Sequence, residues 1–291
     1  MPGFKIIADS ASDLPEGYAA AHDITVVPYS VTLDGETYYH ENVDMTVDEF
    51  YARMTETKVF PKTSQLSIAD HYDAIKPYAE AGTPVVSVCM TSKFTGSYNS
   101  LISALAQLRE DYPDAEVYPI DSLNASACES MLIQEIVRMR RDGRTAAEAA
   151  EICERLKSES NIFITVDTLE YLQRGGRIGK VSAMAGALLG IKPIIQMSGG
   201  ELLPYSKIRG RRKAINETIR LTEEFVGGGK SDYLYCVIGS SGSEETGYVA
   251  DALRTEYGED FIYSCRLGIT ITAHIGPTVL GVAALKKYDR I

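Results

Sequence analysis

Residues 84–98 contain the pattern that best indicates the fold class. Their sequence is Pro84-Val85-Val86-Ser87-Val88-Cys89-Met90-Thr91-Ser92-Lys93-Phe94-Thr95-Gly96-Ser97-Tyr98. The apolar run from Pro84 to Cys89 predicts a buried strand, and a helical pattern begins at Tyr98. Hydroxyl side chains and a glycine lie between the two. The order of strand, polar loop and helix recurs along the chain, which favours a mostly parallel sheet covered by helices.

Further strands and helices are predicted on both sides of this stretch in the first half of the chain. The other expected strands are Lys5–Ala8, Ile24–Val27 and Glu116–Ile120, and residues 29–39 around Asp34-Gly35 predict a hairpin. The residue pattern of a capping box marks three helix starts, at 46–49, 67–70 and 145–148. We also expect helices over 68–81 and 124–141.

A second set of elements begins near Asn161. It contains predicted strands at Ile162–Val166, Ile191–Met197, Tyr233–Gly239, Phe261–Cys265 and Ile269–Thr272, and predicted helices at Val181–Leu189, Arg211–Phe225 and Ser243–Tyr257. We therefore predict an α/β protein of two α/β domains, residues 1–160 and 161–291. The first domain is expected to hold the mostly parallel, helix-covered sheet.

The composition excludes several classes of protein. The 291 residues include 45% hydrophobic and 24% charged residues, as in a globular protein rather than a disordered one. The net charge of −11 argues against a general nucleic-acid binder, which needs a cationic surface. Five widely spaced cysteines without a C-x-x-C pair argue against a disulfide framework or a zinc site. With neither a signal-like nor a membrane-spanning stretch, we expect a cytoplasmic protein without stable membrane insertion.

Polar loops follow three of the predicted strands, at Asp9–Asp13, Thr91–Ser97 and Asp121-Ser122. The carboxyl ends of parallel strands meet at one edge of a sheet, and a loop that opens a helix offers free N–H groups to an anion. A further hydroxyl cluster, Thr63-Ser64, precedes the capping box at Ser67. Hydroxyl residues also serve as simple helix caps, so a binding site is one of two interpretations of these loops.

Two other features are candidates for function. His274 stands beside Gly276-Pro277, which fixes its backbone, whereas we expect His22, His40 and His71 to be solvated. From Arg174 to Lys213 there are nine basic residues and a single acidic one, Glu201, so this stretch is a candidate docking surface. Gly229-Lys230-Ser231 lacks the first glycine of a P-loop, and no G-x-S-x-G elbow or metal-ligand spacing is present. We therefore expect no metal, no cofactor and no nucleophile–base pair.

Six segments along the whole chain form a combined pattern: 5–15 (with Asp9-Ser10-Ala11-Ser12-Asp13), Thr63-Ser64-Gln65, 91–98, Gly176-Arg177-Ile178-Gly179, Ile191-Lys192-Pro193-Ile194 and His274-Ile275-Gly276-Pro277. In these segments, and in their order, the chain resembles the DegV family of bacterial fatty-acid-binding proteins. The sequence departs from the family pattern at Leu66, Thr91, Thr95 and Thr278, where the family usually has Pro, Ser, Ser and Gly. Thr91 and Thr95 keep the hydroxyl of serine, and the added methyl groups reduce the local space.

The resemblance implies a long-chain fatty acid held between the two domains. It places the carboxylate near Thr63, Ser64, Ser92, Thr95, Gly96 and His274, and it places Arg177 and Arg209 on a surface that docks a separate ATP-binding kinase subunit. In that role the protein carries the acyl chain while the kinase phosphorylates the carboxyl group to an acyl-phosphate for lipid synthesis. The hydroxyl and N–H donors further suggest a carboxylate without a tight arginine partner.

Three alternatives remain open. A lipid sensor or transport protein without a kinase would share the same site. A stand-alone hydrolase or acyltransferase would use a loop serine with His274, but no acidic residue orients that histidine in the sequence. An RNA or regulatory module would use the basic stretch from Arg174 to Lys213, where Tyr205 is the only aromatic residue.

Overall fold

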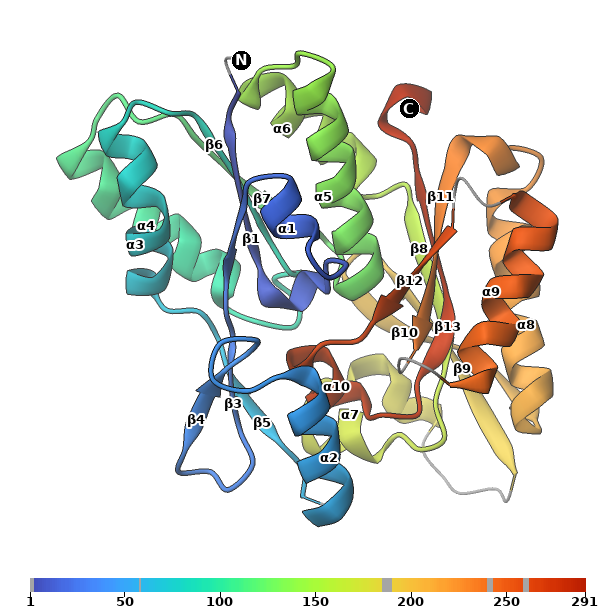
Figure 1. Ribbon diagram of the computed structural model, residues 1–291. Coiled ribbons are helices and arrows are strands. Elements are labelled where there is room, and N and C mark those ends of the chain that lie inside the picture. The colour runs from blue at the N-terminus through green and yellow to red at the C-terminus, as the bar shows by residue number, and fades with distance from the viewer. Residues whose placement is uncertain (1–2, 58, 185–189, 240–242, 259–261) are drawn as a thin grey trace.

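The computed structural model describes residues 3–57, 59–184, 190–239, 243–258 and 262–291 (Figure 1). Its first sheet is parallel and has the strand order β2-β1-β6-β7. The strands are β1 (Lys5–Asp9), β2 (Ile24–Val27), β6 (Val85–Cys89) and β7 (Val117–Asp121). Strands β1 and β6 are buried along their whole length, as expected for a sheet with helices on both faces.

Helices cover this sheet on two sides (Figure 1). Helices α3 (Ile68–Glu80) and α4 (Ser97–Asp111) pack together on one side, and α5 (Ser126–Arg141) and α6 (Ala146–Leu156) on the other. The short α1 (Tyr18–Ala21) precedes β2, and the 3-10 helix η1 (Ser10–Ser12) follows β1. The capping boxes predicted at Ser67 and Thr145 are confirmed, because in each case the side-chain and backbone bonds are both present.

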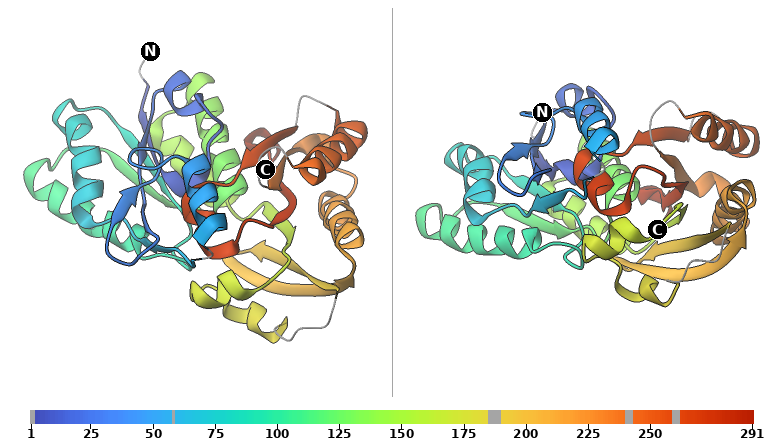
Figure 2. Two further views of the ribbon diagram at one scale, coloured as in Figure 1. Left: turned by 60° about the horizontal axis from the view of Figure 1, so that its bottom comes forward. Right: turned by 90° about the horizontal axis from the view of Figure 1, so that it is seen from below.

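The second sheet is mixed and has the strand order β10-β9-β8-β13-β11-β12. Its strands are β8 (Ser160–Thr165), β9 (Ile191–Ser198), β10 (Glu201–Arg209), β11 (Tyr233–Gly239), β12 (Ile262–Arg266) and β13 (Leu280–Lys286). Only β11 and β12 pair in parallel. Helices α8 (Arg211–Val226) and α9 (Glu244–Tyr257) lie on the outer face of this sheet (Figures 1 and 2).

Helix α5 lies between the two large sheets and belongs to the core of both. It packs against β1 on one side and against β8, β11 and β13 on the other. Twelve of its sixteen residues are therefore buried. In β13 the small residue Ala283 packs in the same core as α5, and a side chain at Gly281 would collide with the backbone of the neighbouring strand β8.

A small antiparallel sheet, β4-β3-β5, extends the first half of the molecule. It consists of β3 (Ser30–Thr32), β4 (Tyr38–His40) and β5 (Lys62–Ser64), so the predicted hairpin is confirmed. Helix α2 (Val47–Thr57) connects β4 to β5, and Thr46 and Glu49 form the expected capping bonds at its start. Helix α10 (Ile269–Ile275) comes from the other end of the chain and packs against β3 and β5.

Several predicted elements differ from the structure. The predicted strand Ile269–Thr272 is wrong, because these residues form α10, whose first N–H groups are bound by carboxylates from the first half of the chain. Instead of the helix predicted from Val181, the described residues form a 3-10 helix, η2 (Gly179–Met184), and 185–189 lie outside the described residues. The prediction missed β5, β10, β13 and α7 (Glu170–Arg174). His71 is buried rather than solvated.

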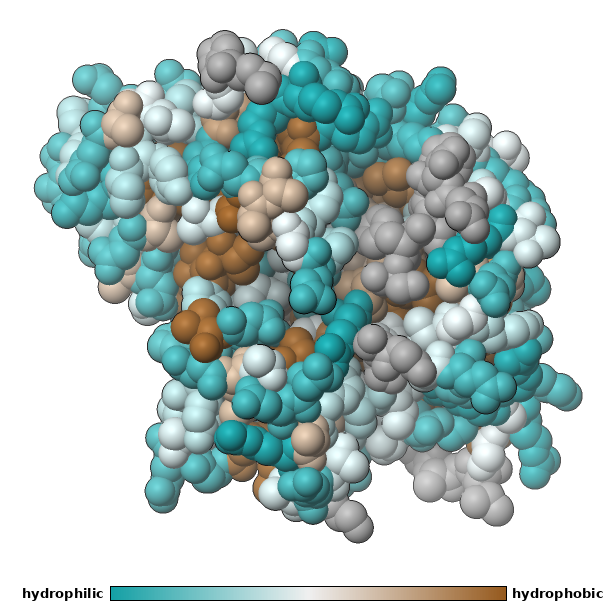
Figure 3. Space-filling view, viewed as in Figure 1, coloured by the Kyte–Doolittle hydropathy of each residue, from teal (hydrophilic) through white to brown (hydrophobic). Residues whose placement is uncertain are grey.

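The surface is mainly polar. Figure 3 shows charged and polar side chains over most of one face, with apolar residues in small patches within its hollows. Val43 and Tyr38 are among the large apolar residues that are exposed. Among the described residues, no helix is both long enough and apolar enough to cross a bilayer. All five cysteines are buried and unpaired.

Candidate functional site

A cavity of about 320 Å³ lies between the two large sheets. Its walls come from both halves of the chain, since β5 and the loop after β6 contribute from the first half and β8, β9, β11 and α10 contribute from the second. Most of the wall is apolar: Met90, Phe94, Ile162, Ile164, Leu172, Met197, Leu202, Ile238, Leu267, Ile271, Ile275 and Val279. A cavity of this size and lining is typical of a small-molecule site.

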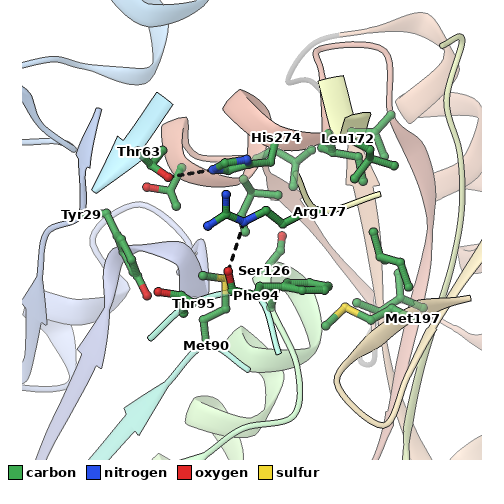
Figure 4. Close-up of a pocket in the computed structure, with 18 of the residues that line it drawn as sticks. Tyr29, Thr63, Met90, Phe94, Thr95, Ser126, Leu172, Arg177, Met197 and His274 are labelled. Atoms are coloured by element: carbon green, nitrogen blue, oxygen red, sulfur yellow. Dashed lines mark hydrogen bonds between the residues drawn. The ribbon is translucent and has the colours of Figure 1, made fainter. Parts of the chain in front are cut away.

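Polar side chains gather at one end of this cavity (Figure 4). Thr63 lies on β5, Thr95 lies in the loop that opens α4, and His274 lies on α10. The guanidinium of Arg177, from the segment after α7, points toward them. Four separate segments therefore bring hydrogen-bond donors to one place. The pattern of strands and helices in the sequence indicates these segments only one by one.

The hydrogen bonds around Thr95 leave its hydroxyl proton available. Ser97 Oγ accepts from the Tyr29 hydroxyl at 2.9 Å and from the Leu66 N–H at 3.1 Å, so both of its lone pairs are used. Its own proton is therefore donated to Thr95 Oγ1, 2.9 Å away. Thr95 Oγ1 also accepts the Ser97 N–H. The Thr95 O–H is thus free to donate to a ligand in the cavity.

His274 is held against Thr63 and is neutral at pH 7. Its Nε2 lies 2.7 Å from Thr63 Oγ1. Burial, reinforced by the positive charge of Arg177, lowers the pKa of His274 from 6.5 to about 4. When Nε2 carries the ring proton it donates to Thr63, and the Thr63 hydroxyl proton is then free for a ligand. Gly175 leaves room for the ring, because a side chain there would fall within 3.0 Å of Nδ1.

Arg177 gives the site a positive charge. Its Nε donates to the Phe94 carbonyl at 3.1 Å and its Nη1 to the Gly175 carbonyl at 2.6 Å, which fixes the guanidinium plane. Within the described part of the chain, Nη2 makes no hydrogen bond or ion pair. The expectation of a carboxylate site without a nearby arginine is therefore not met, since Arg177 lines the cavity.

The predicted site residues divide into two groups. Thr63, Ser64, Thr95 and His274 line the cavity, as does Arg177, which the sequence placed on a docking surface. Ser92 and Gly96 do not line it, and their N–H groups are already used, since Ser92 N–H donates to Asp121 Oδ1 and Gly96 N–H to Gln65 Oε1. Arg209 lies on the edge strand β10, exposed to solvent and outside the cavity.

Sequence reasoning did not assign four polar residues of the lining to the site: Tyr29, Gln65, Ser126 and Thr270. Tyr29 follows β2 directly, so the rule that strand ends carry site residues could have found it. Ser126 starts α5 with a left-handed φ of 53° and donates to Asp13, a geometry with no local sequence signal. The apolar lining from the second half was also missed, since strand patterns do not reveal which face of a sheet meets the other domain.

A second cavity of about 350 Å³ adjoins the first and shares Phe94, Arg177 and Leu202 with it. It is more polar, and Lys93, Lys180 and Glu201 complete its charged lining. Lys180 and Glu201 form an ion pair at 2.7 Å. The donor end of the first cavity is therefore bordered by cations.

Among the described residues, no group of three or more His, Cys, Asp or Glu side chains could hold a metal ion.

The fold and the cavity define an α/β protein in which two large sheets border an apolar cavity that has hydrogen-bond donors and a cation at one end. The family model described as "Uncharacterised protein, DegV family" matches residues 3–287. The chain belongs to the DegV family.

Solved and curated relatives are similar over nearly the whole chain. A stearic-acid-binding protein from Eubacterium ventriosum is 37% identical with a TM-score of 0.92, covering 99% of this chain and 100% of its own. A fatty-acid-binding DegV family protein from Thermus thermophilus is 26% identical with a TM-score of 0.88, covering 98% and 99%. A curated fatty acid-binding protein from Thermotoga maritima is 33% identical over 284 residues, covering 95% of this chain and 96% of its own.

Proposed function

We propose that this protein binds a long-chain fatty acid, with the carboxylate at Thr63, Thr95 and Arg177 and the acyl chain along the apolar walls. The observation that carries the proposal is the polarity of the cavity, which has proton donors and one cation at one end and apolar side chains elsewhere. Relatives that bind fatty acids have the same fold over nearly their full length.

The energetics of the cavity agree with this ligand. Each buried CH₂ group contributes about 0.8 kcal/mol, so a long acyl chain supplies about 10 kcal/mol before the cost of association. A carboxylate is costly to bury unless it is hydrogen-bonded. The Thr95 hydroxyl, the Nη2 group of Arg177 and, when His274 Nε2 carries the ring proton, the Thr63 hydroxyl offset this cost as donors.

The finer proposal is that a separate ATP-dependent kinase phosphorylates the bound lipid in the cytoplasm. In that reaction a carboxylate oxygen attacks the γ-phosphorus of ATP, the new acyl–oxygen–phosphorus bond forms, and ADP leaves. Supporting features are the resemblance to acyl-carrying subunits and the cations Lys93 and Lys180 beside the carboxylate end. Arg209, exposed on the edge strand β10, is the proposed docking residue, and on this proposal the chain itself holds no cofactor besides the bound lipid.

Binding is tested by calorimetric titration of the purified protein with stearate. We expect Thr63→Val and Thr95→Val each to weaken binding by about 1–3 kcal/mol, since each removes one donor to a charged group. Ser92→Ala is the matched control and should bind normally, because Ser92 does not line the cavity. Native mass spectrometry of protein purified from its host should show a co-purified fatty acid. Normal stearate affinity in both threonine variants would refute the carboxylate assignment.

The kinase step is tested with the purified ATP-binding subunit of a fatty-acid kinase, ATP and protein loaded with stearate. We expect acyl-phosphate to form, and Arg209→Ala to slow its formation while stearate affinity stays unchanged. Stearate binding without any phosphate transfer would favour the alternative of a lipid carrier that has no kinase partner. Hydrolysis of an acyl ester by this chain alone would instead favour an enzyme that uses His274.

A further inference from the structure

Helix α10, which carries His274, begins with backbone N–H groups that are bound by two buried carboxylates. Gly268 N–H donates to Asp13 Oδ1 at 2.9 Å, and the N–H groups of Ile269 and Thr270 donate to Glu41 Oε1. The Thr270 hydroxyl also donates to Glu41 Oε2 at 2.7 Å. Both carboxylates come from the opposite end of the chain, more than 220 residues away in sequence.

Both acidic side chains are almost fully enclosed, with Asp13 7% and Glu41 1% exposed. Burial is unfavourable for a carboxylate unless donors surround it. Glu41 accepts four hydrogen bonds, the fourth from Ser10 at 2.7 Å, and Asp13 accepts one from Ser126 at 2.6 Å. Gly268 permits this approach, because a Cβ atom there would fall within 3.0 Å of both carboxylates. These hydrogen bonds form a specific, buried contact between the two ends of the chain.

Glu41 is also connected to the other wall of the site. Ser10 Oγ, which donates to Glu41, accepts the Tyr29 N–H at 2.9 Å. The hydroxyl of the same tyrosine donates to Ser97, whose proton is donated to Thr95. Tyr29 therefore connects two sets of hydrogen bonds: its backbone N–H reaches Glu41 through Ser10, and its hydroxyl reaches Thr95 through Ser97. From Glu41, α10 leads to His274, which contacts Thr63.

We propose that Asp13 and Glu41 are positioning residues of the lipid site, which hold α10 so that His274 and Thr63 face Thr95 across the cavity. The inference rests on the proposed fatty-acid function and extends it, because it assigns the recognition of the head group to two acids that do not line the cavity. Arg177 is the charged group that faces His274 directly, whereas Asp13 and Glu41 act on it through the helix.

The test compares two probes that share an acyl chain, stearate and 1-octadecanol. Variants Glu41→Gln and Asp13→Asn keep the side-chain size but remove an acceptor at the start of α10. We expect each to lower the affinity for stearate about tenfold and to leave the affinity for 1-octadecanol unchanged. The ring resonances of His274 should shift as well, since its contact with Thr63 is loosened.

Glu129→Gln is the matched control. Glu129 is 0% exposed, does not line the cavity, and within the described residues neither of its carboxylate oxygens has a hydrogen-bond partner. This variant should leave the preference for stearate over 1-octadecanol at the wild-type value, whatever its effect on thermal stability. Ser10→Ala removes the hydroxyl that links Glu41 to the Tyr29 N–H. This variant should reduce the preference for stearate over 1-octadecanol even if Glu41→Gln does not fold.

The outcomes separate the two proposals. If the wild-type protein fails to bind stearate, the proposed function is wrong. If the wild-type protein binds stearate but the folded Glu41, Asp13 and Ser10 variants keep the wild-type ratio of affinities, the proposed function stands and the positioning role is overturned.

Discussion

At the scale of single residues, the environment of His274 sets its charge. Burial and the nearby guanidinium of Arg177 both lower the pKa of His274, to about 4 from 6.5. In the unfolded chain the imidazole takes up a proton near pH 6.5, whereas in the folded protein it does so only near pH 4. The unfolded state therefore binds more protons between these values, and the contribution of His274 to stability is lost as the pH falls through this window.

The resulting prediction compares the pH dependence of the free energy of unfolding in the wild type and in the variant His274→Gln. Relative to His274→Gln, the wild type should lose free energy of unfolding on the order of 3 kcal/mol between pH 6.5 and pH 4, as urea titrations at several pH values would measure. The comparison is necessary because buried Asp9, whose pKa burial raises to about 7, has the opposite pH dependence. A His274 ring that titrates near pH 6.5 by NMR would contradict this prediction.

At the scale of elements, the end of α7 packs closely against α10 because Gly175 has no side chain. Gly175 has an ordinary helical φ of −74°, so an alanine there is acceptable for the backbone. Its methyl group would nevertheless collide with the His274 ring. We predict that Gly175→Ala weakens stearate binding at least tenfold while the protein remains folded, as measured by calorimetry and circular dichroism.

Gly247→Ala provides the control for this substitution. Gly247 lies inside α9, and a methyl group there would meet nothing within 4 Å. Alanine is the better helix former, so this variant should gain about 0.5–1 kcal/mol of stability and bind stearate normally. Equal stearate affinity in the two glycine variants would show that Gly175 does not govern the position of His274.

The elements also show what local sequence can predict. The buried strands β1 and β6 and the capping boxes at Ser67 and Thr145 follow from residue patterns that act within a few positions, and they are confirmed. Helix α10 does not follow from them, because its β-branched sequence, Ile269-Thr270-Ile271-Thr272, favours a strand. Distant carboxylates of Asp13 and Glu41 determine its start, and such a contact has no signature in the local sequence.

At the scale of the whole molecule, the cavity takes its walls from both large sheets, so a bound lipid stabilises the folded state as a whole. A ligand that binds only the folded protein adds about 2.7 kcal/mol when its free concentration is a hundred times Kd. For a chain of this size we expect the melting temperature to rise by roughly 5 °C with stearate, measured by calorimetry. A Thr63→Val, Thr95→Val double variant should show a smaller rise at the same stearate concentration.

The same scale shows why the site was only partly predictable. The family resemblance led to Thr63, Thr95 and His274, and the structure brings all three to one end of a cavity. The same resemblance assigned Arg177 to a docking surface, whereas in the structure its side chain lines the cavity. The division of the chain near residue 160 stays a prediction, although the strands of the two large sheets lie on either side of it.

The hydrogen bonds between the start of α10 and the carboxyl groups of Asp13 and Glu41 have a consequence for biosynthesis. A ribosome makes Asp13 and Glu41 early, but the helix that they hold is translated more than 220 residues later. Until then Thr63 lacks its contact with His274, and the wall formed by α10 is missing. On the proposed function, a nascent chain therefore binds its fatty acid at this site only after residue 275 has been synthesised.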